Sequence, residues 1–319
     1  MNKVRVGVLR GGPGSEYEVS LKTGASVLKH LPQEKYIPID IFIDKEGIWH
    51  LGGMPKEPGE LIKHIDIVFN ALHGESGKVQ QILSTTGIPY TGPKPLAAAT
   101  GRHKVLAKEK FKSAGIKTVP HELFDITKDD EAKINIIFRT LAGPWIIKPV
   151  NHGSSIGISF ARTYEELIRA IIKALEYSTE IVVETYIKGR EATCGIIENF
   201  RGSHLYSLLP VEIVPPPEKK FFDYDSKYGT LTQEICPGRF SSGETQEIQE
   251  LARRAHTTIG ARHYSRSDFI VTSQGIYILE INNATDVGLT EESLMPKALS
   301  SVGISLSSFL DHVVRQSLS

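Results

Sequence analysis

The chain has little of what several common protein classes require. It holds only two cysteines among 319 residues, Cys194 and Cys236, and their spacing matches no metal-binding motif. So low a count is typical of free thiols in a reducing compartment. No apolar run approaches the roughly 20 residues that span a bilayer. The opening MNKVRVGVLRGG reaches its glycines too early for a signal peptide. We therefore expect a cytoplasmic protein with no membrane partner.

An excess of charge of either sign is also missing. Lys plus Arg and Asp plus Glu both number 37, so the formal net charge is zero. Nucleic acids and anionic membranes bind proteins through basic surfaces, so neither is expected as a partner. The apolar and charged fractions, 40% and 23%, are those of an ordinary globular protein. The length fits one long domain or two to three smaller ones.

The first third of the chain alternates strands with helices. It contains the strand and glycine turn VRVGVLRGG, a helix, the strands YIPIDIFI and HIDIVFNALHG, the helix KVQQILSTTG and the short strand IPYTG. This alternation predicts a parallel, doubly wound α/β sheet. Ligands bind such sheets at the carboxyl ends of the strands, where we expect His73 and the loop 11–18. The PKP sequence at 93–95 indicates a boundary, so this domain is predicted over residues 1–96.

The middle of the chain carries features of a phosphate site. Lys148 ends the apolar run in GPWIIKPVNHGSSIGISFA, and the loop 151–157 that follows is rich in glycine and serine. Backbone donors beside a lysine suit a triphosphate. The Walker pattern is absent, so the loop is not a P-loop. Lys104 lies near the start of a basic helix. A further helix begins with the capping box of Thr163 and Glu166.

The last part of the chain holds a long loop and a hairpin. The proline-broken, aromatic stretch around 215–237 predicts a mobile lid. An amphipathic helix follows, and then the strands FIV and IYILEI, joined by a turn. Asp268 stands on the first strand, and Glu280 and Asn282 share one face of the second. Two carboxylates and an amide suit Mg²⁺. A solvated edge hairpin has the same alternation, so this motif alone does not decide.

Taken together, these motifs resemble one family. GGPGSEYEVSL, ALHGESG, PYTG, KPVNHGSSIGIS, FFDYDSKY, RSDFIV and LEIN occur in the order found in D-alanine–D-alanine ligases of the ATP-grasp superfamily. The resemblance implies an α/β protein, α+β in its ATP-grasp part. It has the N-terminal doubly wound parallel sheet domain followed by a two-part ATP-grasp module, with a lid domain at 97–187 and a catalytic domain at 188–319. ATP, D-alanine, a homodimer and peptidoglycan precursor synthesis are implied with it.

The resemblance implies where ATP and its metals bind. The residues that match the family's nucleotide site are Lys104, Lys148, Ser154, Ser155, Glu184, Thr185, Tyr186, Ile187 and Glu191. The two lysines are expected to bind the phosphates, and the serine loop to close over them. The run 184–187 is expected to contact adenine, and Glu191 the ribose. Asp268, Glu280 and Asn282 are expected to hold two Mg²⁺ ions, which Mn²⁺ can replace.

The resemblance also implies where the amino acids bind. The matching residues are Glu18, His73, Ser154, Lys227, Tyr228, Arg266, Gly288, Ser293 and Leu294. Glu18 is expected to bind the first ammonium and, with Ser154 and Tyr228, to latch the lid. Arg266 and the Gly288 N–H are expected to stabilise the oxyanion. Lys227, Ser293 and Leu294 are expected to hold the second carboxylate.

One segment departs from the family pattern. The family reads Asn-Thr-x-Pro-Gly-x-Thr after the metal strand, whereas this chain reads NNATDVGLT, with no proline and two extra residues. We therefore expect a loosely held segment before Gly288, a relaxed second subsite and slow turnover. A different second substrate, either another D-amino acid or a D-hydroxy acid, stays open, as does an ATP-binding regulator. The Lys227–Tyr228 pair favours an amine acceptor.

Overall fold

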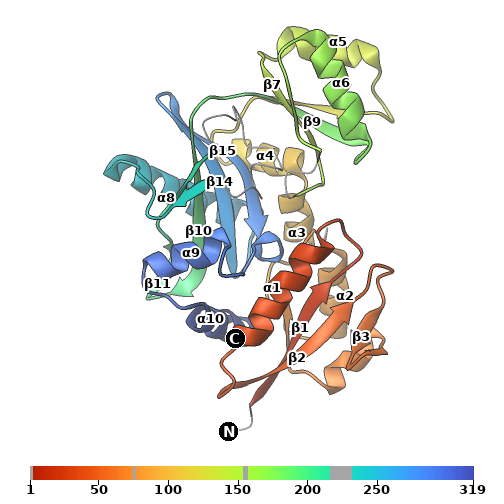
Figure 1. The fold of residues 1–319 in the computed structure, drawn as a ribbon, viewed down its shortest axis with the longest axis vertical. Helices are drawn as coiled ribbons and strands as arrows, with labels where there is room; N and C mark the ends of the chain where they lie inside the picture. Colours follow the sequence, from red (N-terminus) through yellow and green to blue (C-terminus); the bar gives the residue numbers. More distant parts are fainter. Residues whose placement is uncertain (1–2, 75–76, 154–156, 216–231) are drawn as a thin grey trace.

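Three β-sheets follow one another along the chain in the computed structural model (Figure 1). The structure describes residues 3–74, 77–153, 157–215 and 232–319. The N-terminal sheet lies at the bottom of the view, the central sheet at the top, and the C-terminal sheet between them. Within the described residues no helix is both long and apolar enough to cross a membrane. Both cysteines are free thiols, as predicted.

The N-terminal sheet has the strand order β4-β3-β2-β1-β5. Its elements are β1 (Val4–Gly11), α1 (Tyr17–His30), β2 (Tyr36–Ile43), β3 (Trp49–Leu51), β4 (Met54–Pro55), the 3-10 helix η1 (Pro58–Lys63), β5 (Ile67–Asn70) and α2 (Lys78–Thr86). The predicted parallel pairing holds for β2, β1 and β5. Strands β3 and β4 add an antiparallel edge that was not predicted. The expected strand IPYTG makes only a single bridge, between Tyr90 and Val68.

Gly11 shows why glycine follows the first strand. Its φ is +91°, and an added Cβ would lie 2.1 Å from the carbonyl oxygen of Ile43 on the neighbouring strand. Only glycine accepts such a backbone next to such a close neighbour. The turn therefore brings the chain from the end of β1 directly to the start of α1, at the ligand-binding edge of the sheet.

The central sheet is antiparallel, with the strand order β6-β9-β7-β8. The elements of this part are α3 (Pro95–Arg102), α4 (Lys104–Ser113), β6 (His121–Asp125), α5 (Glu131–Thr140), β7 (Trp145–Pro149), β8 (Ser159–Ala161), α6 (Tyr164–Leu175) and β9 (Glu180–Thr185). The Thr163 hydroxyl caps α6 by accepting the Glu166 N–H at 3.2 Å. The apolar face of α6 is buried, because its residues recur at helical spacing against the sheet.

The C-terminal sheet is also antiparallel, in the order β13-β12-β10-β14-β15, with β11 beside β10. The elements are β10 (Arg190–Phe200), β11 (Ser203–Ser207), β12 (Val211–Val214), β13 (Gln233–Ile235), α8 (Ser242–Ile259), β14 (Tyr264–Thr272), β15 (Gly275–Asn283), η2 (Ala284–Asp286), α9 (Leu294–Ser301) and α10 (Leu306–Leu318). The predicted hairpin is confirmed, since Thr272 pairs with Gly275 across a turn of two residues.

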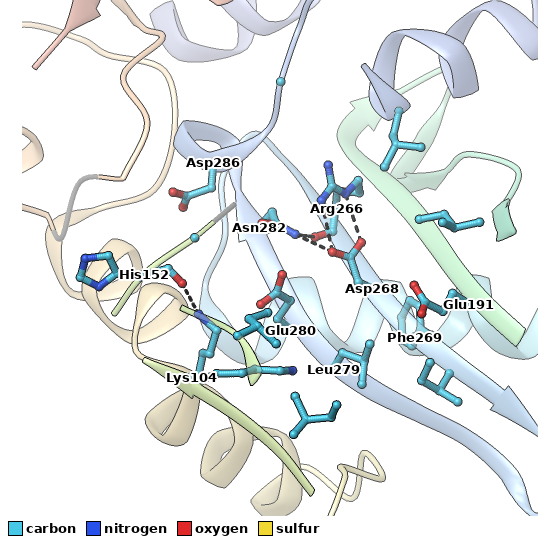
Figure 2. A pocket seen from close by; sticks show the side chains of 18 of the residues that line it. Lys104, His152, Glu191, Arg266, Asp268, Phe269, Leu279, Glu280, Asn282 and Asp286 are labelled. Atoms are coloured by element: carbon cyan, nitrogen blue, oxygen red, sulfur yellow. Dashed lines mark hydrogen bonds and ion pairs between the residues drawn. The ribbon is translucent and has the colours of Figure 1, made fainter. Parts of the chain in front are cut away.

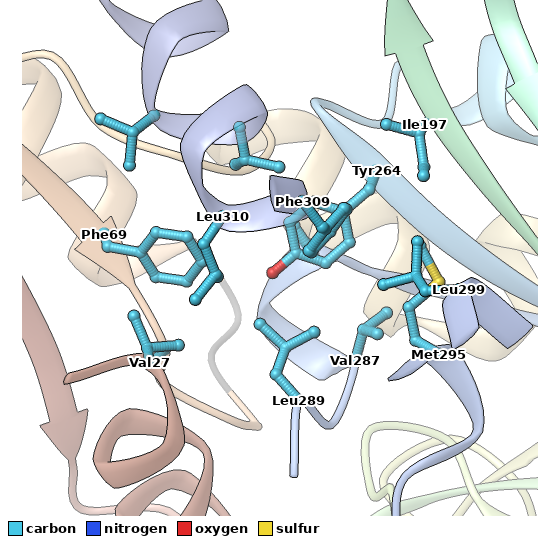
Figure 3. Packing of buried hydrophobic residues seen from close by; sticks show 14 of the residues in the cluster. Val27, Phe69, Ile197, Tyr264, Val287, Leu289, Met295, Leu299, Phe309 and Leu310 are labelled. Atoms are coloured by element: carbon cyan, nitrogen blue, oxygen red, sulfur yellow. The ribbon is translucent and has the colours of Figure 1, made fainter. Parts of the chain in front are cut away.

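One hydrophobic core joins the first and last parts of the chain (Figure 3). Val27 of α1 and Phe69 of β5 pack in the same cluster as Phe309 of α10 and Tyr264 of β14. The Tyr264 and Phe309 rings meet edge to face, 5.0 Å between centroids, a favoured geometry for buried aromatic pairs. The central sheet has a core of its own. The N-terminal and C-terminal sheets therefore form a shared base for the site.

Candidate active site

A cleft of about 450 Å³ is lined by residues from all three parts of the chain, a volume typical of small-molecule sites. The predicted site residues that line it are His73, Lys104, Lys148, Glu184, Thr185, Tyr186, Ile187, Glu191, Arg266, Asp268, Glu280, Asn282, Gly288, Ser293 and Leu294. They lie on α4, β7, β10 and the hairpin, on or just after β9, in the loop after β5, and at or before the start of α9, so residues far apart in sequence converge. Ser154, Ser155, Lys227 and Tyr228 lie outside the described residues.

A buried carboxylate holds the lysine of β7 in place. Glu184 is 2% exposed, and its two oxygens lie 2.8 Å from Lys148 Nζ and 2.9 Å from Lys108 Nζ. Burial alone would raise the pKa of Glu184, but the two ammonium groups lower it to about 2. Lys148 keeps a raised pKa, because Glu184 and Glu280 outweigh the effect of its burial. The glutamate predicted to contact adenine thus sets the phosphate lysine's charge and position.

The pKa of Lys104, at the start of α4, is set by opposing effects. Its Nζ donates to the His152 carbonyl oxygen on the loop after β7 (Figure 2). Burial lowers the pKa of Lys104 to about 8, with Arg102 and Lys148 adding to the shift and Glu280 and Glu184 opposing it. The ammonium form is therefore the one present below about pH 8. A phosphate group in the cleft would supply the negative charge that this site favours.

This pKa predicts that ATP binds more weakly in alkaline solution. Above about pH 8 the free protein loses the Lys104 charge, so affinity should fall roughly tenfold between about pH 7 and pH 9. Calorimetric titration with ATP across this range measures the effect. Lys104→Arg should flatten the profile, because a guanidinium stays charged. Equal slopes in the two proteins would exclude Lys104 as the titrating group.

The strand that leaves the central sheet forms one wall of the cleft. Thr185 and Tyr186 donate their backbone N–H groups to the carbonyl oxygens of Pro120 and Pro144, at 2.9 and 2.7 Å. These bonds fix the run 184–187 at the edge of the cleft, and Glu191 lines the same wall at the start of β10. The predicted nucleotide residues that the structure describes therefore line the same cleft.

The hairpin brings its three oxygen-bearing residues together as predicted. Asp268 and Glu280 pair across β14 and β15, and Asn282 lies on the same face as Glu280. Figure 2 shows Arg266 and Asn282 converging on Asp268. Arg266 donates to both carboxylate oxygens, from Nε at 3.1 Å and Nη2 at 3.2 Å, and the Asn282 amide donates at 3.0 Å. Thr193 Oγ1 adds a bond of 2.6 Å.

This donor set fits a hard divalent cation. Like charges directly opposite on neighbouring strands destabilise a hairpin unless a cation compensates them, and Asp268 faces Glu280 in this way. All the donors are oxygen or amide groups, which suit Mg²⁺ rather than Zn²⁺. The positive charges of Arg266, Lys104 and Lys148 surround the pair in the protein itself. Asp268, Glu280 and Asn282 are therefore the residues that would hold the metal.

The expected role of Glu18 is corrected by the structure. Glu18 lies in the first turn of α1, is exposed and does not line the cleft. Glu16, at the N-cap of α1, is 6% exposed and does line it. Side chains two positions apart along a helix point in directions that differ by about 200°. Only one of the two glutamates can therefore face the cleft. Gly153 passes so close that an added Cβ would lie 2.8 Å from Glu16 Oε2.

The other predicted amino-acid residues that the structure describes line the same cleft as Glu16. His73 is buried and neutral, because burial lowers its pKa to about 4, and its Nε2 lies 3.0 Å from Thr23 Oγ1. Gly288 lies against Ser293, whose Oγ would be 2.7 Å from an added Cβ. Ser293 is the N-cap of α9, and Leu294 begins that helix. Free N–H groups at a helix start suit a carboxylate.

The segment before Gly288 is not loosely held, contrary to our expectation. Ala284 and Asp286 bound the 3-10 turn η2, and Val287 and Leu289 are fully buried in the shared core (Figure 3). The Ser26 hydroxyl of α1 donates to the Leu289 carbonyl oxygen at 2.7 Å. The longer segment forms the turn η2. Burial of Val287 and Leu289 holds the chain before Gly288 in place, as a proline would otherwise do.

Some residues of the site escaped the sequence analysis. Lys108 was not predicted as a site residue, yet it is 1% exposed and ion-paired with Glu184. Its position four residues after Lys104, on the same helical face, is a signal that could have shown this. Arg102 and Asp286 also line the cleft. They lie 184 residues apart, so no local pattern connects them.

The antiparallel central sheet and the metal-type hairpin, with a nucleotide-sized cleft between them, define an ATP-grasp protein. Comparison with known families agrees. The family model described as "D-ala D-ala ligase N-terminus" matches residues 5–58, and the family model described as "D-ala D-ala ligase C-terminus" matches residues 111–315. The chain belongs to the D-alanine–D-alanine ligase family. Enzymes of this family depend on ATP and Mg²⁺ and make the dipeptide used for peptidoglycan.

Similar proteins cover the whole chain. The D-alanine–D-alanine ligase of Syntrophobacter fumaroxidans is 35% identical, over 99% of this chain and 98% of its own length. That of Clostridium beijerinckii is 34% identical, over 99% of each. The structure of the VanG D-Ala:D-Ser ligase from Enterococcus faecalis covers 99% of this chain and 100% of its own, with a TM-score of 0.87 and 30% identity. The Bacillus anthracis D-alanine–D-alanine ligase complexed with ATP covers 99% and 97%, with a TM-score of 0.79 and 27% identity.

Proposed function

We propose that this protein joins two D-alanines at the expense of ATP. One observation supports this most strongly: the phosphate lysines, the metal-type hairpin, Glu16 and the donor group Gly288 line a single cleft. Phosphoryl transfer needs the lysines and the hairpin. Peptide-bond formation also needs a group that binds the substrate's ammonium, here Glu16, and a group that stabilises the oxyanion, here the Gly288 N–H. A protein that only binds ATP has no use for the last two.

In the proposed first step the carboxylate of the first D-alanine attacks the γ-phosphorus of ATP. An oxygen–phosphorus bond forms, the bond to ADP breaks, and the product is an acylphosphate. Glu16 faces the ammonium of this amino acid, while Lys104 and Lys148 neutralise the transferred phosphoryl group. Metal ions held by Asp268, Glu280 and Asn282 would supply further charge neutralisation at the phosphates.

In the second step the neutral amine of the second D-alanine attacks the acyl carbon. The carbon–nitrogen bond forms, the carbon–oxygen bond to phosphate breaks, and the proton lost by the amine ends on the departing phosphate, which leaves as hydrogen phosphate. We assign oxyanion stabilisation to Arg266 and the Gly288 N–H; such a donor is worth about 3 kcal/mol. Ser293 and the start of α9 at Leu294 would hold the second carboxylate. Lys227, Ser154, Ser155 and Tyr228 keep their proposed roles in substrate binding and lid closure.

A second candidate product is D-alanyl-D-serine. Thr290 and Glu292 line the cleft beside Ser293, so the second subsite has polar side chains able to accept a hydrogen bond from a hydroxyl group. The D-Ala:D-Ser ligase from Enterococcus faecalis also shares the fold over the whole chain. D-Alanine stays the leading proposal for the first subsite in either case.

We further propose three domains, at 1–96, 97–187 and 188–319, with the stretch 215–237 as a lid. The central sheet has a core of its own, and a second core lies wholly within the N-terminal part, which supports the division. A homodimer and a cytoplasmic location are proposed from the family resemblance alone. Light scattering of the purified protein tests the dimer.

An amino-acid panel tests the proposed function. The protein is incubated with ATP, Mg²⁺ and D-alanine, alone or with a second D-amino acid or D-lactate. ADP release and product mass are then scored. We expect D-alanyl-D-alanine as the main product. ADP release that ignores D-alanine would refute the proposal, and a preference for D-serine would favour the second candidate.

A further inference from the structure

The segment of the chain that departs from the family pattern is tied to the cleft by charge as well as by packing. Asp286 ends the turn η2, two residues before Gly288. One of its carboxylate oxygens accepts from Arg102 Nη1 at 2.8 Å and from the Gly74 N–H at 3.4 Å. Packing holds the start of the same turn, because Asn283 is fully buried and donates to the Ala97 carbonyl oxygen of α3 at 3.2 Å.

Arg102 connects this turn with two other parts of the protein. Its Nη2 donates to Glu16 Oε2 at 2.8 Å, and its Nε donates to the Asn151 carbonyl oxygen at 3.0 Å. The three charged side chains, of Arg102, Glu16 and Asp286, are only 9%, 7% and 12% exposed. One guanidinium thus bonds the N-terminal loop, the loop after β7 and the turn before Gly288, all at the wall of the cleft.

In this cluster two carboxylates bond the Arg102 guanidinium. His73 adds no positive charge, since burial lowers its pKa to about 4. The planar fork of arginine can donate to several acceptors in fixed directions, which an ammonium group cannot. Removing the side chain of Arg102 or of Asp286 would therefore change both the position of the turn and the charge next to the Glu16 carboxylate.

We infer that Arg102 and Asp286 are a positioning pair for the ligation reaction. The pair fixes the turn that leads to the Gly288 N–H, and Arg102 also holds the Glu16 carboxylate by a direct bond, so that the two substrate subsites keep a set separation. This inference rests on the proposed function. It assigns to this ion pair, together with the apolar packing of Val287 and Leu289, the constraint that proline gives in the family pattern.

Kinetics of three variants of the full-length protein test the pair. Asp286→Asn and Arg102→Gln should each lower kcat/KM for D-alanine by about tenfold to a hundredfold, because a donor displaced by about 1 Å costs that much. KM for ATP should stay within about twofold. ADP released per dipeptide should rise, since a misplaced Gly288 slows amine attack relative to hydrolysis. The kcat/KM for D-alanine of the double variant should be no lower than that of the less active single variant, because the two residues act as one unit.

Asp311→Asn is the matched control. Asp311 is also a buried, ion-paired carboxylate, bonded by Lys35 Nζ at 3.0 Å and Tyr36 Oη at 2.8 Å, and it joins the first and last parts of the chain away from the cleft. A similar loss of kcat/KM for D-alanine and of coupling in Asp311→Asn would mean that Arg102 and Asp286 only stabilise the fold, and it would overturn the inference. So would multiplicative losses in the double variant, or a parallel rise in KM for ATP.

A failure of Asp286→Asn to fold still leaves a test. The double variant Arg102→Gln/Asp286→Asn removes both charges of the pair, so it leaves no unpaired guanidinium. If it folds and keeps normal kcat/KM and normal coupling, the inference is wrong. The proposed function fails in a different way, because the unaltered protein would then form no dipeptide from D-alanine.

Discussion

Glu280→Gln should abolish turnover while the protein stays folded. The substitution removes one of the two carboxylates that would hold the metal, but it keeps the shape of a half-buried side chain on β15. Loss of a metal carboxylate removes several kcal/mol of transition-state stabilisation, so we expect a decrease in kcat of about a thousandfold. ADP release with saturating ATP and D-alanine measures the rate, and thermal denaturation measures stability.

Asp268→Asn provides an informative companion. It should be equally inactive, but less stable, because it takes from the buried Arg266 a carboxylate bonded at 3.1 and 3.2 Å. Breaking a buried ion pair costs about 3 kcal/mol. If either variant kept near-normal activity, the hairpin would not be the metal site. Equal stability of the two would mean that Arg266 finds another partner.

Glu16→Gln should impair binding of the first amino acid more than binding of ATP. The substitution keeps the hydrogen-bonding shape but removes the negative charge facing the substrate's ammonium. A charge-assisted bond in a buried site is worth about 3 kcal/mol, so kcat/KM for D-alanine should fall on the order of a hundredfold. KM for ATP should change little, because Glu16 is not among the residues proposed to bind the nucleotide.

Glu18→Gln is the control for this prediction. Glu18 is on the same helix and chemically identical, but it is exposed and does not line the cleft. It should therefore keep normal activity. A large loss in Glu18→Gln together with normal activity in Glu16→Gln would restore the assignment made from the sequence and contradict the structure. Equal defects in both would indicate that the helix α1 has been disturbed.

Much of the fold was accessible from the sequence, because the informative patterns are local. Periodicity placed the buried face of α8, including Ile248 and Ala255, correctly. Alternation along the strands predicted that Asp268, Glu280 and Asn282 come together across the hairpin, and a register shift between Asp268 and Phe269 sets Asp268 opposite Glu280. The capping box at Thr163 marked the start of α6. In each case the residues that determine the structure are close neighbours in the chain.

The errors came from features that local patterns do not encode. Glu16 and Glu18 differ only in which side of α1 they face, and this depends on where the helix begins and on its neighbours. The tight packing before Gly288 depends on Val287 and Leu289 finding a core built with α1 and α10. The Arg102–Asp286 pair spans 184 residues, so its presence follows from the packing of three parts of the chain.

The measurement that most directly tests the account uses D-alanine labelled with heavy oxygen in its carboxylate. If that carboxylate attacks the γ-phosphorus, the bond to carbon breaks later and the oxygen leaves with phosphate. We therefore predict one labelled oxygen in inorganic phosphate for each D-alanyl-D-alanine formed, together with one ADP. Unlabelled phosphate, label in a nucleotide product, or ADP release without dipeptide would contradict the account.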